Sequence, residues 1–218
     1  MPGWMYQLKA TIVGATPPVW RRLLVPEATT LLRLPQVLQA ACGWWDGHLH
    51  KFKIGGVRYG TGDGEGWGPP PKSERRARLG AVTEAGTTFA SVYDFGDHWQ
   101  HRLVVETILA AVPGATHPAC SAGRRACPPE DCGGVRGCAD VPTAIGDASN
   151  PEHDSLLEWV GGAFDPGAFD PGDVADRRRL GRLAWQAPRS ARTTTARAVG
   201  RRRGSVSPIS RAPAPIAP

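Results

Sequence analysis

The chain has 218 residues, of which 26 are basic and 20 acidic, and this length suits one globular domain with an appendage. No window approaches the roughly 18 consecutive apolar residues of a membrane span, and the opening MPGWMYQLK lacks signal-peptide features, so we expect a cytoplasmic protein. Eleven of the basic residues lie from Arg177 onward, where no acid occurs. Residues 1 to 176 therefore carry 15 basic against 20 acidic side chains, a formal charge of −5, and only the tail is basic.

Alternating apolar and polar residues predict the first strand, from Tyr6 to Val13. The pair Pro17-Pro18 cannot continue a ladder, and the segment from Trp20 to Val25 predicts a second strand. These two strands are expected to form a hairpin.

A helix is predicted from Thr30, a residue suited to the N-cap, to Gly43, which suits a C-terminal stop. Its apolar residues are spaced three and four apart, at Leu31, Leu34, Val37, Leu38 and Ala41. Alternation returns from His48 to Ile54, and Gly55-Gly56 turns the chain back through Val57 to Tyr59. The order of elements to this point is ββαββ.

A further hairpin is predicted from Thr87 to Tyr93 and from His101 to Leu109, joined by the turn DFGDHWQ. The Gly- and Pro-rich segment between Gly60 and Ser73 indicates a surface loop. A short acidic helix is expected from Pro151 to Val160, and another near Asp173.

The predicted fold class is α+β, with a mixed sheet and one packed helix in a β-grasp-like core, followed by the further hairpin and short C-terminal helices. We expect one domain over residues 1–183. Residues 184–218 are mostly Arg, Ala, Ser, Thr and Pro, a composition that predicts a disordered tail. Such a tail is expected to bind nucleic acid without reading its sequence.

Four cysteines cluster in one segment, at Cys120, Cys127, Cys132 and Cys138, whereas Cys42 stands alone in the sequence. Zinc needs about four thiolate or imidazole ligands, and the loop ACSAGRRACPPEDCGG could wrap such an ion. No CxxC pair is present, so reduced cysteines and disulfides remain open alternatives.

Two histidines, His48 and His50, are expected to project from one face of a predicted strand. If the DFGD turn met this strand in space, Asp94, Asp97 and His101 would join them in a metal or hydrolytic site. The alternatives are a polar strand face for the histidines and Asx-type turn stabilisation for the aspartates.

Several segments together carry a family resemblance: YQLKATIVGATPPVWRRLLVP, GWWDGHLHKFKIGG, YDFGDHWQHRLVVE, AGRRACPPEDCGG and EHDSLLEWVGGAFDPGAFD. In this order, over roughly residues 4 to 176, the chain resembles the plasmid pRiA4b Orf-three-like family. Members of that family are largely uncharacterised. They have been labelled insertion-sequence passenger or resolvase-like proteins, so the resemblance implies an association with mobile elements.

Recombinase catalysis is not expected from these residues. The first serine of the chain is Ser73, in the loop region, whereas a serine recombinase needs its nucleophile in an N-terminal catalytic domain. The only tyrosines are Tyr6, Tyr59 and Tyr93, all in the first half, whereas a tyrosine recombinase needs a late nucleophile.

The positions that match the family pattern are Trp20, Arg21, His48, His50, Asp94, Phe95, Gly96, Asp97, Cys120, Cys127, Pro128, Pro129, Glu130, Asp131, Gly133 and Gly134. Cys138 departs from the pattern, because an aromatic residue is usual there. A zinc site would accordingly rest on Cys120, Cys127 and Cys132, with one further ligand from elsewhere.

Two functions are expected from this sequence. The first is a non-catalytic binding protein associated with mobile elements, with nucleic acid or a protein as partner and the CPPEDCGG loop as a structural or metal-clipped surface. The acidic residues Glu130-Asp131 and the segment from Glu152 to Glu158 offer a docking face for a protein partner. The alternative is a metal-dependent enzyme using His48, His50, the Asp94–Asp97 turn and His101.

Overall fold

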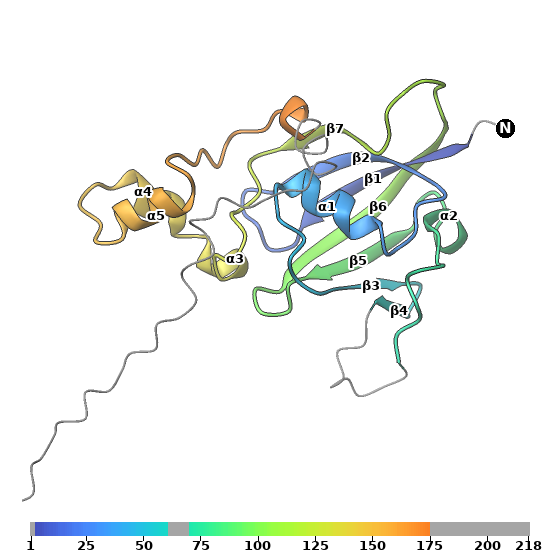
Figure 1. Cartoon of the computed structure of the whole chain (residues 1–218), viewed down its shortest axis with the longest axis horizontal. Helices are drawn as coiled ribbons and strands as arrows, with labels where there is room; N and C mark the ends of the chain where they lie inside the picture. The colour runs from blue at the N-terminus through green and yellow to red at the C-terminus, as the bar shows by residue number, and fades with distance from the viewer. Residues whose placement is uncertain (1–2, 61–69, 175–218) are drawn as a thin grey trace, which may run out of the picture. The chain divides into compact units, whose positions relative to one another are not determined.

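The computed structural model describes residues 3–60 and 70–174, and these residues form an α+β fold, as predicted (Figure 1). The elements, in chain order, are β1 (Trp4–Ile12), β2 (Trp20–Pro26), α1 (Leu34–Cys42), β3 (His50–Ile54), β4 (Val57–Gly60), α2 (Leu79–Val82), β5 (Thr88–Tyr93), β6 (Trp99–Ala110), β7 (Ala119–Arg124), α3 (Gly134–Gly137), α4 (Val141–Gly146) and α5 (His153–Trp159). The predicted tail, residues 184–218, and most of the predicted loop after Gly60 lie outside the described residues.

Seven strands form one sheet in the order β4-β3-β5-β6-β1-β2-β7. All three predicted hairpins are present, but every ladder between these strands is antiparallel, so the prediction of a mixed sheet was wrong. The β-grasp-like core is not confirmed, because β5 and β6 lie between the first two hairpins. Local alternation specifies a strand and its hairpin partner, whereas the neighbour of each hairpin is chosen by burial across the whole sheet.

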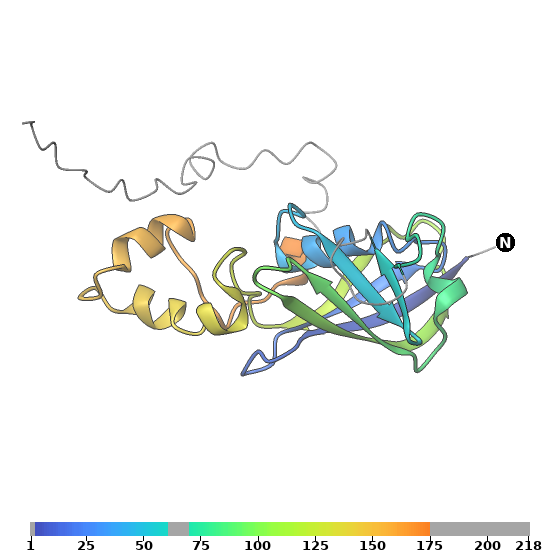
Figure 2. The ribbon, with the colours of Figure 1, turned by 90° about the horizontal axis from the view of Figure 1, so that it is seen from below.

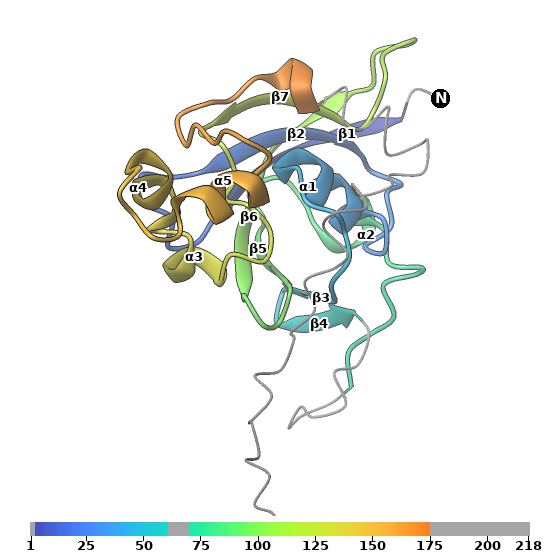
Figure 3. The same ribbon diagram turned by 60° about the vertical axis from the view of Figure 1, so that its left-hand side comes forward.

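The main core lies between the sheet and α1, and Figure 3 shows the sheet curving around this helix with β7 and β4 at its edges. Alternate residues of each strand point towards the helix, because side chains alternate between the two faces of a strand. The buried contributors include Leu8 and Ala10 of β1, Leu23 and Val25 of β2, Leu103 and Val105 of β6, and Leu34, Val37, Leu38 and Ala41 of α1. On the opposite face, polar residues pair across strands: Arg22 bonds Glu106, with 2.6 Å between Nε and Oε2.

The first helix is shorter than predicted, because α1 begins at Leu34 and not at Thr30. The residues before it form turns, and Pro35 occupies the first turn, where a missing amide hydrogen is tolerated. The predicted stop is confirmed: Gly43 has a left-handed φ of 83°, and its amide donates to the carbonyl of Gln39 at 2.8 Å. None of the described helices has the length and apolar character needed to cross a membrane.

Strand β7 was not predicted. Its residues, ACSAGR, lack a clear alternation, yet they pair with β2 through a ladder interrupted between Arg22 and Leu23. The aromatic ring of Phe169 lies where a side chain at Gly123 would project, so an added side chain would displace that ring. Pairing with β2 places Cys120 in the sheet and the CPPEDCGG loop just beyond its end.

One end of the sheet gathers three loops. Strands β1 and β5 end there, and β2, β3 and β6 begin there, as antiparallel pairing requires. A second cluster of buried residues packs at this end: Ile12, Val19, Cys42, Trp44, Tyr93, Trp99, Cys127 and Cys138. Figure 2 shows the β5–β6 turn and α3 close together at this end. The loops after α1, β5 and β7 are therefore brought to one place.

Candidate cation site

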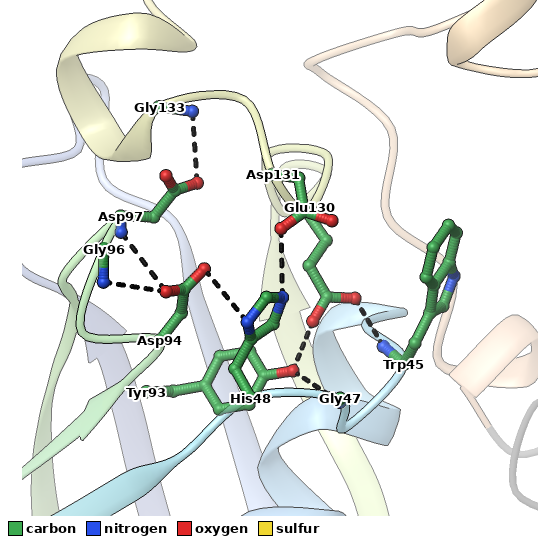
Figure 4. Close-up of polar contacts among 10 residues, drawn as sticks. All are labelled: Trp45, Gly47, His48, Tyr93, Asp94, Gly96, Asp97, Glu130, Asp131 and Gly133. Atoms are coloured by element: carbon green, nitrogen blue, oxygen red, sulfur yellow. Dashed lines mark hydrogen bonds and ion pairs between the residues drawn. The ribbon is translucent and has the colours of Figure 1, made fainter. Parts of the chain in front are cut away.

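Three side chains from these three loops meet at His48 (Figure 4). The imidazole Nδ1 lies 3.6 Å from Oδ2 of Asp94, in the turn after β5. The other ring nitrogen, Nε2, lies 3.0 Å from Oδ1 of Asp131, in the CPPEDCGG loop. The Asp94 side chain is only 10% exposed, whereas those of His48 and Asp131 are 37% and 49% exposed. The group is thus anchored at Asp94 and open to solvent on its other side.

Both aspartates have left-handed backbone conformations, with φ of 53° at Asp94 and 62° at Asp131. Left-handed residues other than glycine are uncommon and cluster at ligand sites and tight turns. At Asp94 the turn is closed by its own carboxylate, because Oδ1 accepts the amides of Gly96 at 2.9 Å and Asp97 at 3.3 Å. The predicted Asx-type stabilisation is therefore confirmed at Asp94, and the second oxygen of the same carboxylate faces His48.

Asp97 fastens the CPPEDCGG loop to the β5–β6 turn. Its Oδ2 accepts the amide of Gly133 at 3.1 Å. Gly134 has φ of 70°, and a side chain there would collide with the backbone carbonyl of Asp97. Two successive glycines thus let the loop approach the turn closely enough to place Asp131 against His48.

Glu130 forms a second, more buried set of contacts beneath this group. The Tyr93 hydroxyl donates to Oε1 of Glu130 and accepts the amide of Gly47 at 3.0 Å. The amide of Trp45 donates to Oε2 of Glu130 at 2.6 Å. Burial raises the pKa of Glu130 above its ordinary value, and burial together with the Glu130 hydrogen bond raises that of Tyr93. These contacts join the α1–β3 loop to the CPPEDCGG loop.

The side chains of His48, Asp94 and Asp131 are of the types that bind metal ions. Within the described ranges, His48, Asp94 and Asp131 are the one set of three ligand residues whose donor atoms all lie within 4.8 Å of one another. One imidazole and two carboxylates offer nitrogen and oxygen donors to a divalent transition ion such as Mn²⁺ or Zn²⁺. We therefore define His48, Asp94 and Asp131 as the candidate cation site.

The other predicted members of this site lie elsewhere. His50 does not share a strand face with His48, because β3 begins only at His50; its Nε2 instead lies 2.9 Å from Oε2 of buried Glu74. His101 is buried within β6, with Nε2 3.9 Å from the sulfur of Cys42, and burial lowers its pKa to about 4. The convergence expected of a hydrolytic site thus holds for His48 and Asp94, and not for His50 and His101.

The predicted zinc ligands are also divided. Cys132 forms a disulfide with Cys138. The thiol of Cys127 is hydrogen-bonded to that of Cys42, and Cys120 lies near enough for its charge to act on Cys42. Burial and the Cys127 hydrogen bond raise the pKa of the Cys42 thiol. The cysteine that stands alone in the sequence therefore joins Cys127 in space.

A groove of about 390 Å³ adjoins the candidate cation site. Its walls come from the CPPEDCGG loop, α4, α5 and their flanking residues, and they comprise Asp131, Cys132, Gly137, Asp140, Val141, Ala144, Glu152, Leu156 and Trp159. Three of these residues are acidic and none is basic. Asp131 belongs to both the groove and the candidate cation site, whereas His48 and Asp94 do not line the groove.

Sequence reasoning did not assign Asp131 to a metal site, nor Tyr93 and Glu130 to its support. From the sequence, Glu130 and Asp131 are predicted only to be acidic residues of the CPPEDCGG motif and part of a docking face. The signal that could have found them is the combination of two acids with two following glycines, which indicates a tight loop. Its contact with His48 depends on the pairing of β7 with β2, and β7 carries no local signal.

Comparisons with known proteins agree with this fold. The family model for "Plasmid pRiA4b ORF-3-like protein" matches residues 4–173. The "Uncharacterized protein y4hQ" of Sinorhizobium fredii is 40% identical over 157 residues, which cover 71% of this chain and 80% of that protein. The crystal structure of MM3350 from Methanosarcina mazei, titled a protein of unknown function, superposes with a TM-score of 0.71 at 37% identity, covering 79% of this chain and 97% of the other. The chain therefore belongs to the plasmid pRiA4b ORF-3-like protein family.

Proposed function

We propose that this chain is a non-catalytic cytoplasmic binding protein that takes up one divalent transition-metal ion at the candidate cation site and uses it to hold a nucleic-acid phosphate. The observation that carries the proposal is the meeting of donor atoms from His48, Asp94 and Asp131 within 4.8 Å. The left-handed backbone at both aspartates supports it, since such conformations persist where the surroundings enforce them.

The charge of the molecule explains why an ion would be needed. Residues 1 to 176 carry a formal charge of −5, and the groove beside Asp131 is lined by acids without a base. Phosphate would be repelled from such a surface. A divalent ion neutralises the two carboxylates of the site and presents open coordination positions to an anion. A nucleic-acid ligand also accords with the mobile-element association that the family resemblance implies.

The contacts of the potential catalytic groups support a binding role. Both ring nitrogens of His48 face carboxylates, so the imidazole joins two loops and leaves no nitrogen directed at a substrate. The Tyr93 hydroxyl and the Glu130 carboxylate are bonded to each other beneath the surface. A general base needs a nitrogen or oxygen within reach of the substrate proton.

The metal claim is tested by titrating the chelator-treated full chain with Mn²⁺ in a calorimeter. We expect one saturable site, and Asp131→Asn and His48→Gln should each weaken it by about tenfold or more. The matched control is Glu152→Gln, which neutralises another acid of the same groove without touching the cation site. Equal affinity in Asp131→Asn and the unaltered chain would contradict the proposal.

The ligand claim is tested with the same proteins and short single- and double-stranded DNA and RNA, with and without Mn²⁺. Binding by the arginine-rich tail would be independent of the ion and would survive Asp131→Asn. We expect an additional Mn²⁺-dependent component that Asp131→Asn removes. If binding is the same with and without Mn²⁺, the nucleic-acid part of the proposal fails, whatever the calorimetry shows.

A second candidate function is metal-dependent hydrolysis, and the open position of Asp131 at the groove favours it. A divalent ion there could lower the pKa of a bound water and present it to a ligand in the groove. Hydrolysis of bis(4-nitrophenyl) phosphate in the presence of Mn²⁺, lost in Asp131→Asn and kept in Glu152→Gln, would establish this function in place of simple binding.

A further inference from the structure

A second group of metal-ligand side chains lies inside the protein, separate from the candidate cation site. Cys42 ends α1, His101 lies in β6 and Cys127 follows β7, and all three are more than nine-tenths buried. The sulfur of Cys42 is 3.9 Å from Nε2 of His101, and its thiol is hydrogen-bonded to that of Cys127. We call these three residues the buried thiol cluster.

A small cavity lies among these side chains. Cys42, His101, Cys127 and Arg21 border it together with apolar residues of β1, β2 and α1. Its volume of about 10 Å³ corresponds to a single atom or ion. The imidazole of His101 is poorly satisfied: within the described part of the chain Nδ1 makes no hydrogen bond of full geometry, the backbone of Trp99 interacts with the ring, and Nε2 has only the long contact with sulfur. Buried polar atoms are normally bonded, so this ring points to an additional partner.

The spacing of the donor atoms is close to that around zinc. With Zn–S of about 2.3 Å and Zn–N of about 2.0 Å, tetrahedral ligands lie roughly 3.6 Å apart, against 3.9 Å between Cys42 and His101. The donors of all three residues do not lie within 4.8 Å of one another, so an ion would draw the Cys127 sulfur towards the imidazole. Cys120 is half-buried in β7, where its thiol donates to the carbonyl of Ala122 at 3.5 Å, and its charge acts on Cys42; we assign it the fourth position as the remaining free thiol of the described residues.

The surroundings provide charge compensation. Three thiolates and one imidazole around Zn²⁺ carry a net charge of −1. Arg21 is buried beside the cluster, and its guanidinium donates to the carbonyls of Ala41, Trp20 and Arg124 at 2.9, 2.9 and 3.2 Å. One buried positive charge, held by backbone carbonyls, balances such a site and lowers the cost of forming thiolates.

We propose that Cys42, Cys127 and His101 hold one structural zinc ion, with Cys120 as its fourth ligand. The sequence predicts Cys120, Cys127 and Cys132 with one further ligand. The proposed set has Cys42 in place of Cys132, and His101 is the further ligand. The ion would clip the end of α1, strand β6 and the loop that carries Glu130 and Asp131. A site with four protein ligands and no open position is structural, not catalytic.

The test uses Co²⁺ added to the metal-free full chain with its thiols reduced. Thiolate ligands give intense charge-transfer absorption with Co²⁺, whereas His48, Asp94 and Asp131 contain no sulfur and give none. We expect one equivalent with thiolate absorption, lost in Cys127→Ser and kept in the matched control Cys138→Ser. Absence of this absorption in the unaltered chain, or its loss in Cys138→Ser alone, would overturn the proposal.

A second measurement uses the unaltered chain, so its result does not depend on whether a variant folds. X-ray absorption of the protein carrying one equivalent of zinc should show three sulfurs at about 2.3 Å and one nitrogen. A shell of oxygen and nitrogen alone would refute the buried site. The Asp131→Asn variant separates the two proposals, because it should lose Mn²⁺ binding and keep the cobalt–thiolate absorption.

Discussion

His48 and Asp131 meet across two loops that the sequence keeps far apart: Nε2 of the imidazole lies 3.0 Å from Oδ1 of the carboxylate. The contact exists because β7 pairs with β2 and delivers the CPPEDCGG loop to the end of the sheet where β3 begins. The imidazole links two carboxylates from different loops, and the contact with Asp131 joins the α1–β3 loop to the CPPEDCGG loop at the candidate cation site.

Divalent ions should stabilise the protein through this site. At an ion concentration one hundred times the dissociation constant, binding to the folded state adds about 2.7 kcal/mol to the free energy of unfolding. Thermal unfolding of the chelator-treated chain, recorded with and without Mn²⁺, measures the shift. In His48→Gln the shift should shrink or vanish, whereas Glu152→Gln should retain it; an equal shift in both variants would exclude this site as its source.

Gly134 should be intolerant of substitution. An added side chain would collide with the backbone of Asp97 and would also be strained at φ of 70°, so Gly134→Ala should destabilise the fold by about 1–3 kcal/mol. It should also weaken Mn²⁺ binding, because the loop that carries Asp131 is displaced. Gly146→Ala is the matched control, since nothing lies within 4 Å of a side chain at that position. Denaturant unfolding and calorimetry provide the two readouts.

Arg21 should contribute more to stability than its neighbour Arg22. Arg21→Met removes a buried guanidinium and leaves the carbonyls of Ala41 and Arg124 without that donor, at an expected cost of about 3 kcal/mol. Arg22 is half-buried on the opposite face of the sheet, where it pairs with Glu106 in contact with solvent, and Arg22→Met should cost no more than about 1 kcal/mol. Equal decreases in the free energy of unfolding of the two variants, measured with urea, would show that the buried hydrogen bonds of Arg21 stabilise the protein no more than the ion pair of Arg22 does.

The stability of the metal-free protein should decrease as the pH falls from about 6.5 to 4. Burial lowers the pKa of His101 to about 4, from the ordinary value of 6.5 for a histidine. The unfolded chain therefore binds a proton in this range that the folded chain does not bind, and acid favours unfolding. The full effect amounts to about 3 kcal/mol.

His101→Gln keeps a neutral side chain of similar size and should flatten this part of the pH profile. The profile is measured by urea unfolding at a series of pH values in the presence of a chelator. Carboxylates held in ion pairs affect the stability at lower pH than His101 does. Arg22 lowers the pKa of Glu106, so the stabilisation from that pair is lost only as the pH falls below the ordinary pKa of a glutamate. A profile unchanged by His101→Gln would show that another group is responsible.

The sequence by itself determined most of the local elements and the fold class. Alternation identified β1 to β6, the spacing of apolar residues and Gly43 identified α1, and the resemblance identified the family. Each of these depends on residues close together in the chain, where sterics and burial patterns act directly. The boundaries that failed, at Thr30 and His48, depend on a proline turn and on where the ladder with β5 begins.

Only the tertiary structure decided which chemical groups meet. The order of hairpins in the sheet, the pairing of β7 and the close approach at Gly134 arise from contacts between distant segments, and they fix Asp131 against His48 and Cys42 against Cys127. They also direct His50 to Glu74 and bury His101. The residue type indicates that a side chain can bind metal, but packing across the whole sheet determines which other side chains lie next to it.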